Sequence, residues 1–344
     1  MSEVVVKPVE SSREQRQFLE LPWMLHRQDP LWIPPLRMNQ AELTGFKKHP
    51  FYDIARRQVF LATRDGQPCG RILALVNDVH NQRYNEQRGF FGFFECIDDQ
   101  QVANALFGAA RDWLAAQGMT AIRGPANPSL NYECGLLIDG YHSSPTFMMT
   151  YNPPYYATLI EGYGFRKVKD MYAFYGHINM VDGLDPKLAF IVEEAKRRFQ
   201  IQLRSIDNRR FDQDVHTFLD LYNKSLVGTW GFTPMTAGEI KHTAKALKML
   251  IVPELTSVAE IDGRPVGASF GLLDYNPRIK KIDGRLFPFG FAKLLWNKRG
   301  IKRFRALATN VLPEFQRWGI GLVLLNKLLP DALEWGIQEA EFSW

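Results

Sequence analysis

Two apolar segments of the chain are joined by Gln316-Arg317-Trp318-Gly319-Ile320-Gly321. Residues 306–312 are apolar enough for a central strand, and residues 319–329 have the apolar spacing of a helix. A helix start presents backbone N–H groups without partners, together with the positive end of the helix dipole. Glycine at 319 and 321 removes Cβ atoms that would keep a phosphate away, and Arg317 can add charge-assisted hydrogen bonds. The sequence therefore predicts a diphosphate site.

This arrangement resembles motif A of the GNAT acyltransferase superfamily, Gln/Arg-x-x-Gly-x-Gly/Ala, and the match covers the whole motif. The resemblance implies that the residues of the motif bind the diphosphate of acyl-coenzyme A. It also implies that Val311 and Leu312 lie beside the pantetheine arm. A dinucleotide is the competing ligand, but the third glycine and the acidic residue about 20 positions further on are not evident.

A repeat indicates how the rest of the chain is organised. Residues 62–70 and 259–267 each contain an Asp-Gly turn followed by Pro and Gly, and apolar strand residues flank both runs. Each half then has an amphipathic helix with Ala-x-x-Trp, at 110–113 and 332–335. Chance recurrence explains the turns alone, but the shared order favours duplication. We therefore expect an α/β (α+β) fold of two tandem GNAT-like domains, each a mixed, mostly antiparallel sheet flanked by helices.

The expected domains are 1–180 and 181–344, with the boundary near Asp182-Gly183-Leu184-Asp185-Pro186. The first domain resembles the superfamily at Asn152-Pro153-Pro154-Tyr155-Tyr156, which is similar to its motif B. Its motif A position, 96–102, has two acids and no glycine, so phosphates would be repelled there. We expect a degenerate copy that shapes the acceptor pocket or supports the second domain. The superfamily continues beyond the position of Trp344, so a C-terminal truncation is expected.

Acyl transfer to an amine requires a base, donors for the oxyanion and an acid for the leaving thiolate. A backbone N–H of the strand from Asn310 to Leu312 is the candidate oxyanion donor. Glu314 is the candidate base, directly or through water, and the alternative is an exposed turn carboxylate. The acid is expected to lie beyond Trp344.

Two polar or aromatic loops are candidates for the acceptor site. Asn127, Asn131 and Glu133 lie in a loop bounded by strand-like residues, where they could line a cleft or make local turns. Trp230 lies where the superfamily has its acceptor-binding loop, and core filling is its alternative role.

Composition narrows the class of protein. The chain has 344 residues, 46% of them hydrophobic, and a formal charge of +5, which suits an anionic ligand but not a nucleic-acid binder. No apolar run approaches the roughly 20 residues of a membrane span. Three cysteines without metal-like spacing predict reduced thiols and a cytoplasmic protein, and the histidine spacing predicts no metal site.

The resulting interpretation is an N-acyltransferase that transfers an acyl group, with acetyl favoured, directly from acyl-coenzyme A to an unidentified amine. The alternatives are a noncatalytic acyl-coenzyme A sensor or scaffold and a long-chain acyltransferase at a membrane surface. Residues 285–305 mix aromatic with basic side chains. We interpret them as an amphipathic stretch with one face on the core and one in solvent, and contact with a membrane surface or an acidic lipid is the alternative.

Overall fold

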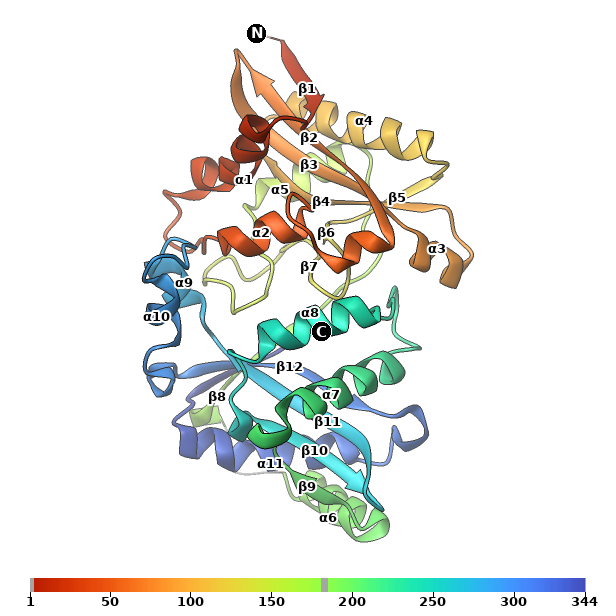
Figure 1. The fold of residues 1–344 in the computed structure, drawn as a ribbon, viewed down its shortest axis with the longest axis vertical. Helices are drawn as coiled ribbons and strands as arrows, with labels where there is room; N and C mark the ends of the chain where they lie inside the picture. The colour runs from red at the N-terminus through yellow and green to blue at the C-terminus, as the bar shows by residue number, and fades with distance from the viewer. Residues whose placement is uncertain (1–2, 181–184, 344) are drawn as a thin grey trace. The chain divides into compact units, whose positions relative to one another are not determined.

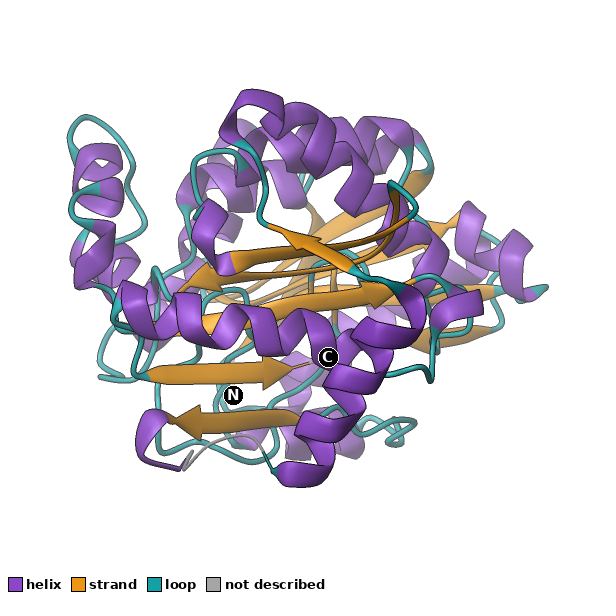
Figure 2. Cartoon of the chain, turned by 90° about the horizontal axis from the view of Figure 1, so that it is seen from below, coloured by secondary structure: helices purple, strands orange, loops and turns teal. Residues whose placement is uncertain are grey.

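The computed structural model describes residues 3–180 and 185–343 (Figure 1). The chain divides into an N-terminal unit, residues 1–170 and 276–294, and a C-terminal unit, residues 171–275 and 295–344. In both units a sheet of mostly antiparallel strands is flanked by helices (Figure 2). This confirms the expected fold class.

The N-terminal unit has a five-stranded sheet in the order β1-β2-β3-β4-β5. The strands are β1 (Val4–Pro8), β2 (Ala55–Arg64), β3 (Gln67–Asn77), β4 (Arg88–Cys96) and β5 (Ala121–Arg123). The last pair is parallel and the others are antiparallel. The helices are α1 (Ser12–His26), α2 (Arg37–Leu43), α3 (Asp78–Tyr84), α4 (Gln100–Ala116) and α5 (Tyr155–Gly162).

The two faces of this sheet are covered differently. α4 buries Val102 and Leu106 in one cluster with Ile72 of β3. The next residue back along β3, Arg71, points to the opposite face, where its guanidinium donates to the carbonyl of Phe18 in α1 (2.8 Å). A short ribbon, β6 (Ala126–Asn127) with β7 (Glu133–Cys134), completes the unit's strands.

The C-terminal unit has a six-stranded sheet in the order β8-β13-β12-β11-β10-β9. The strands are β8 (Ala173–His177), β9 (Gln202–Arg204), β10 (Thr256–Ile261), β11 (Arg264–Leu273), β12 (Arg303–Val311) and β13 (Glu339–Ser343). β12 and β13 are parallel. The helices are α6 (Pro186–Phe199), α7 (Phe211–Ser225), α8 (Ala237–Leu247) and α11 (Ile320–Trp335). α11 packs Ile320 and Leu324 against the sheet, and α7 packs Phe218 against Phe270.

The repeated turns have the same geometry in the two units. Asp65 and Gly66 have φ of 50° and 73°, and Asp262 and Gly263 have φ of 50° and 74°, which are the values of a type I′ hairpin. Both hairpins also have a register shift two to three residues before the turn. The duplicated hairpin predicted from the sequence is confirmed.

The observed division differs from the expected boundary after residue 180 in two places. β8 pairs with β13 through Ala173↔Ser343 to His177↔Glu339, so residues from 171 onward belong to the C-terminal unit. Residues 276–294, between β11 and β12, belong to the N-terminal unit and contain α9 (Asn276–Lys281) and the start of α10 (Gly290–Leu295). Residues 182–184 of the expected boundary lie outside the described residues.

Candidate functional site

The first turn of α11 is a set of backbone amides that nothing in the chain caps. Gly319 is the N-cap residue, with φ of 80° and no side-chain hydrogen bond. Within residues 3–180 and 185–343, no acceptor meets the N–H groups of residues 320, 321 and 322. Helix-start amides of this kind attract phosphate oxygens. The predicted diphosphate site thus lies at a helix start whose amides have no cap within the described ranges, and diphosphate binding there stays a prediction.

The two glycines have different physical roles. A Cβ at Gly319 would lie 2.7 Å from Ile191 Cγ2 of α6, and its positive φ also favours glycine. A Cβ at Gly321 would meet only Thr309 Cγ2, at an ordinary 3.7 Å. Packing inside the protein therefore explains Gly319 but not Gly321. The missing side chain at 321 leaves the space beside the amides open.

The side chains of the motif likewise have different roles, some structural and one available to a ligand. The amide of Gln316 donates to the carbonyls of Ser225 and Val311, each at 3.0 Å, so this side chain fixes the loop to α7 and β12. Arg317 is exposed and has φ of 69°, in the left-handed region. The guanidinium carbon of Arg198 lies over the Trp318 ring, 4.1 Å from the ring centroid. Arg317 is thus the residue of the motif whose charge is available to a ligand.

β12 has an open edge next to these amides. Its parallel pairing with β13 runs from Arg303↔Glu339 to Ala306↔Phe342, whereas its pairing with β11 continues to Val311↔Gly267. Leu312 N–H donates to Val266 O (2.9 Å), so the N–H and C=O of the preceding Val311 point away from β11. By the same alternation the Asn310 N–H points toward β11. Val311, and not Asn310, places a backbone donor on the open edge.

The side chain of Asn310 is nonetheless unusual. It is buried, its Oδ1 accepts from the Ser225 hydroxyl (3.1 Å), and its Nδ2 has no hydrogen-bond partner in the described part of the chain. Such an unpaired buried donor costs free energy, so this position is under an additional constraint. From the sequence, Asn310 was a candidate only for its backbone N–H, as an oxyanion donor.

Glu314 is poorly placed to act as a base. Its carboxylate accepts from Arg264 Nη2 (2.9 Å), and both side chains are exposed. The pKa of Glu314 is lowered, first by its own backbone N–H and then by Arg264. A carboxylate with a lowered pKa is a weaker base. The structure therefore favours the alternative, an exposed turn carboxylate.

The expected acceptor residues do not come from one element. Asn127, Asn131 and Glu133 belong to the N-terminal unit, and Trp230 belongs to the C-terminal unit, in the loop between α7 and α8. Asn127 Oδ1 accepts from the Phe93 N–H (2.7 Å), and its strand partner in the β6–β7 ribbon is Glu133. The backbone N–H of Asn131 donates to Ser129 Oγ (3.2 Å). The side chain of Asn127 thus has the local structural role that the sequence left open.

The N-terminal unit lacks both features of the site. Asp99 caps α4 through the N–H groups of Gln101 and Val102, at 2.8 and 3.3 Å, and pairs with Arg64 (2.8 Å). The edge of β4 is covered as well, since the Phe93 N–H of β4 donates to Asn127 Oδ1 of β6 (2.7 Å). A carboxylate thus occupies the helix start that is bare in α11.

No protein-family model matches the chain. The curated bacterial ceramide synthase of Caulobacter vibrioides (strain NA1000 / CB15N) is 36% identical over 356 residues, covering 100% of this chain and 90% of that protein. The chain belongs to the bacterial ceramide synthase family. Protein YghO of Escherichia coli (strain K12) is 34% identical over 346 residues, and the aligned region covers 99% of this chain and 88% of that protein.

Solved structures identify the fold. A tandem GNAT protein from the clavulanic acid biosynthesis pathway superposes with a TM-score of 0.52 over 99% of this chain and 90% of that chain, at 11% identity. The tandem GNAT-like architecture is therefore confirmed, and this member of the bacterial ceramide synthase family is an acyltransferase. No described helix is long and apolar enough to cross a membrane. Groups of three or more potential metal ligands are absent from the described residues.

A buried charge network in the N-terminal unit escaped sequence reasoning. Glu95 Oε2 lies 2.6 Å from His26 Nε2 and 2.7 Å from Tyr156 Oη, and Arg71 approaches its other oxygen (3.4 Å). Burial raises the pKa of Glu95, but His26, Arg71 and Tyr156 outweigh burial and lower it. The available signal was a carboxylate within the apolar run of β4.

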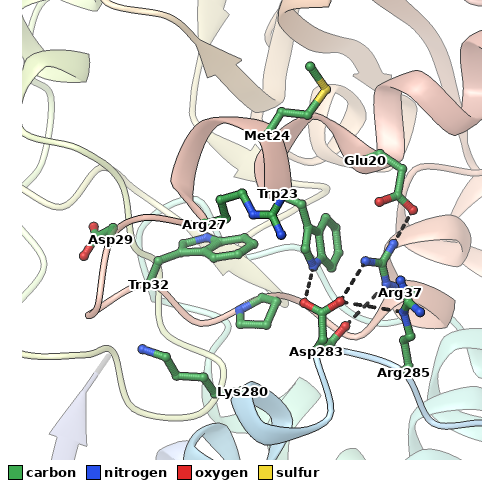
Figure 3. A pocket seen from close by; sticks show the side chains of 11 residues that line it. Glu20, Trp23, Met24, Arg27, Asp29, Trp32, Arg37, Lys280, Asp283 and Arg285 are labelled. Carbon is green, nitrogen blue, oxygen red and sulfur yellow. Dashed lines mark hydrogen bonds and ion pairs between the residues drawn. The ribbon is translucent and has the colours of Figure 1, made fainter.

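A second feature that the sequence missed is a cavity of about 480 Å³ in the N-terminal unit (Figure 3). Two tryptophans, Trp23 and Trp32, form part of its wall. Asp283 accepts from Trp23 Nε1 (2.7 Å) and pairs with Arg37 (3.2 Å), so the segment 276–294 closes one side. Arg27, Lys280 and Arg285 also line it.

Proposed function

We propose that the chain transfers a fatty acyl group from acyl-coenzyme A to the amino group of a long-chain amine, forming an amide. The observation that carries the proposal is the bare first turn of α11 beside the open edge of β12. The whole-length similarity to a protein named as a ceramide synthase favours a long acyl chain and a lipid amine over acetyl transfer. Among the three original interpretations, the long-chain acyltransferase is now preferred.

In the proposed complex the diphosphate binds the amides of residues 320–322 and the Arg317 guanidinium. The pantetheine arm follows the open edge of β12, which brings the thioester carbonyl toward the Val311 N–H. The amine nitrogen attacks that carbonyl carbon, the C–N bond forms, and the C–S bond breaks. One proton leaves the amine and one is taken up by the thiolate, so free coenzyme A and an N-acyl amide are the products.

The test is a two-way substrate panel with the purified full-length chain. Acetyl- and palmitoyl-coenzyme A are each combined with a sphinganine-type amino alcohol and with a short water-soluble amine. Thiol release and mass spectrometry of the N-acyl product are measured together. We expect product from the palmitoyl donor and the long-chain amine, and not from the short amine.

Equal use of acetyl-coenzyme A would contradict the assigned acyl length. Binding of the donor with no amide from either amine would contradict the assigned acceptor class. The Gly321→Glu variant supplies the matched control, because it changes the diphosphate site without touching the acceptor.

A further inference from the structure

An exposed aromatic loop lies in the segment 276–294. Phe287 and Phe289 are 73% and 72% exposed, and Phe291 is 39% exposed. The sequence interpretation placed one face of residues 285–305 on the core, and Leu294 and Phe304 are indeed buried, but Phe287 and Phe289 are not part of that face. Large apolar side chains clustered at the surface mark interaction sites more often than isolated ones do.

The loop is held outward by its own backbone. Phe291 N–H donates to Leu286 O (2.7 Å), which closes residues 286–291 into a tight turn. A Cβ at Gly290 would lie 1.8 Å from Arg285 O, so only glycine allows this closure. The two most exposed phenylalanines therefore lie at the tip of the turn.

The segment is also fixed to the rest of the N-terminal unit. The Arg37 N–H donates to Gly284 O (3.1 Å), the side-chain amide of Asn276 donates to Pro145 O (2.7 Å), and Trp23 Nε1 donates to Asp283. A Cβ at Gly284 would lie 2.2 Å from Pro35 O. The aromatic tip is thus presented on a rigid base, and binding through it would require little ordering of the chain.

Positive charge is concentrated in the same 19 residues. The segment 276–294 contains five Lys or Arg residues and one acid, a net charge of +4, while the whole chain carries +5. The single acid, Asp283, is already paired with Arg37 and Trp23. Lys281 and Lys293 are exposed and have no ionic partner among residues 3–180 and 185–343. The tip is therefore apolar and its surroundings are cationic.

We propose that the segment 276–294 is a docking surface for an anionic lipid bilayer. Exposed aromatic side chains next to unpaired lysines match the interfacial region of a membrane, where rings enter the headgroup layer and cations meet anionic lipids. The inference rests on the proposed function in one respect, since a long-chain amine and an N-acyl product both reside in a bilayer. The surface would bring the enzyme to the layer in which they lie.

Vesicle binding by the full-length chain, measured by flotation without acyl-coenzyme A, tests the docking surface. We expect binding to vesicles that contain phosphatidylglycerol, weak binding to phosphatidylcholine vesicles, and loss of binding as salt is raised. The double variant Phe287→Ser/Phe289→Ser should weaken partitioning at least about tenfold. Lys281→Glu/Lys293→Glu should weaken it similarly, and only on the anionic vesicles.

Two matched controls separate the surface from a general effect. Phe190→Ser removes a phenylalanine of 67% exposure from α6, and Lys241→Glu reverses an exposed lysine of α8. Neither should change vesicle binding. Unchanged partitioning of both double variants, or no binding of the wild-type chain to anionic vesicles, overturns the proposal. Self-association through the loop would also overturn it. That outcome would be seen as concentration-dependent dimerisation that Phe287→Ser/Phe289→Ser abolishes while vesicle binding persists.

Failure of the docking surface and failure of the proposed function give different results. A chain that binds anionic vesicles through this loop but makes no N-acyl amide retains the surface and loses the proposed reaction. The double variants should acylate a detergent-solubilised amine at the wild-type rate, which also shows that they are folded.

Discussion

The Ser225 hydroxyl donates to Asn310 Oδ1 at 3.1 Å, and this contact joins the last residue of α7 to the penultimate residue of β12. In the N-terminal unit the same two positions are His26, the last residue of α1, and Glu95, the penultimate residue of β4, which lie 2.6 Å apart. The duplicated fold has therefore kept one contact while its chemistry changed. A charged network occupies the position in the N-terminal unit. In the C-terminal unit a neutral pair occupies it, and the Asn310 Nδ2 has no hydrogen-bond partner among the residues that the structure describes.

The difference between the two contacts is accompanied by a difference at the starts of helices α4 and α11. The copy with the charged network also has Asp99 at the start of α4 and a β4 edge covered at Phe93. The copy with the neutral pair has bare amides and an open β12 edge. We therefore infer that the N-terminal unit has become a supporting domain and that ligand chemistry is confined to the C-terminal unit.

Gly321→Glu should abolish acyl-coenzyme A binding and leave the fold intact. The new carboxylate would lie beside the diphosphate, and two like charges about 4 Å apart repel by about 4 kcal/mol at the effective dielectric of a protein surface. A Cβ at this position meets only an ordinary contact, so Gly321→Ala should keep its stability and most of its affinity. Calorimetric titration with coenzyme A compares the two. Similar affinities of the Glu and Ala variants would rule out the site.

One acyl-coenzyme A should bind per chain. Asp99 already satisfies the start of α4, so a second diphosphate would meet a carboxylate there. The measured stoichiometry should be one for the wild-type chain and zero for Gly321→Glu. A stoichiometry of two, or a remaining site in that variant, would show that the N-terminal unit binds the ligand after all.

Arg317→Gly should weaken ligand binding while the free energy of unfolding stays equal or rises. Arg317 has φ of 69°, which costs an L-residue roughly 1–2 kcal/mol, and glycine removes that cost. Loss of the cation should lower coenzyme A affinity about tenfold and reduce its salt dependence. Arg317→Ala is the matched control, since it loses the charge but keeps the strained φ. If both variants bind as tightly as wild type, Arg317 does not contact the phosphates.

The elements that were predictable from the sequence are those set by local interactions. Asp65-Gly66 and Asp262-Gly263 fix their hairpins through φ values that few residues accept, and the two Ala-x-x-Trp segments lie in helices, α4 and α11, as their amphipathic pattern indicated. The motif from 316 to 321 was recognisable because its chemistry lies in consecutive backbone groups.

The missed features depend on contacts between distant parts of the chain. Pairing of β8 with β13 joins residues more than 160 positions apart, and no local pattern specifies that partner. The direction of the Val311 N–H follows from the register with β11, so the sequence could name the strand but not the donor. Likewise, Gln316 matched the motif as a ligand residue, whereas the carbonyls of Ser225 and Val311 give it a structural role.

Asp99 should stabilise the N-terminal unit in a way that depends on pH. Its pKa is lowered: burial raises it, but Arg64 and the N–H groups of Gln101 and Val102 outweigh burial. The folded state therefore favours the ionised form. This contribution is complete at neutral pH and is lost as the pH falls from about 4, the ordinary value, through the lower folded pKa. Asp99→Ala should lower the free energy of unfolding by about 1–2 kcal/mol at pH 7, because it removes the helix cap.

Asp99→Asn tests the charge separately, since asparagine keeps a capping oxygen but cannot ionise. Denaturant unfolding at pH 7, 5, 4 and 3 should show the Asn variant closer to wild type at pH 3 than at pH 7. Glu95, whose pKa is also lowered, remains in both proteins and gives them a common loss of stability in acid. A constant difference between the two proteins across this range would mean that the Asp99 charge contributes nothing, and that capping alone explains the residue.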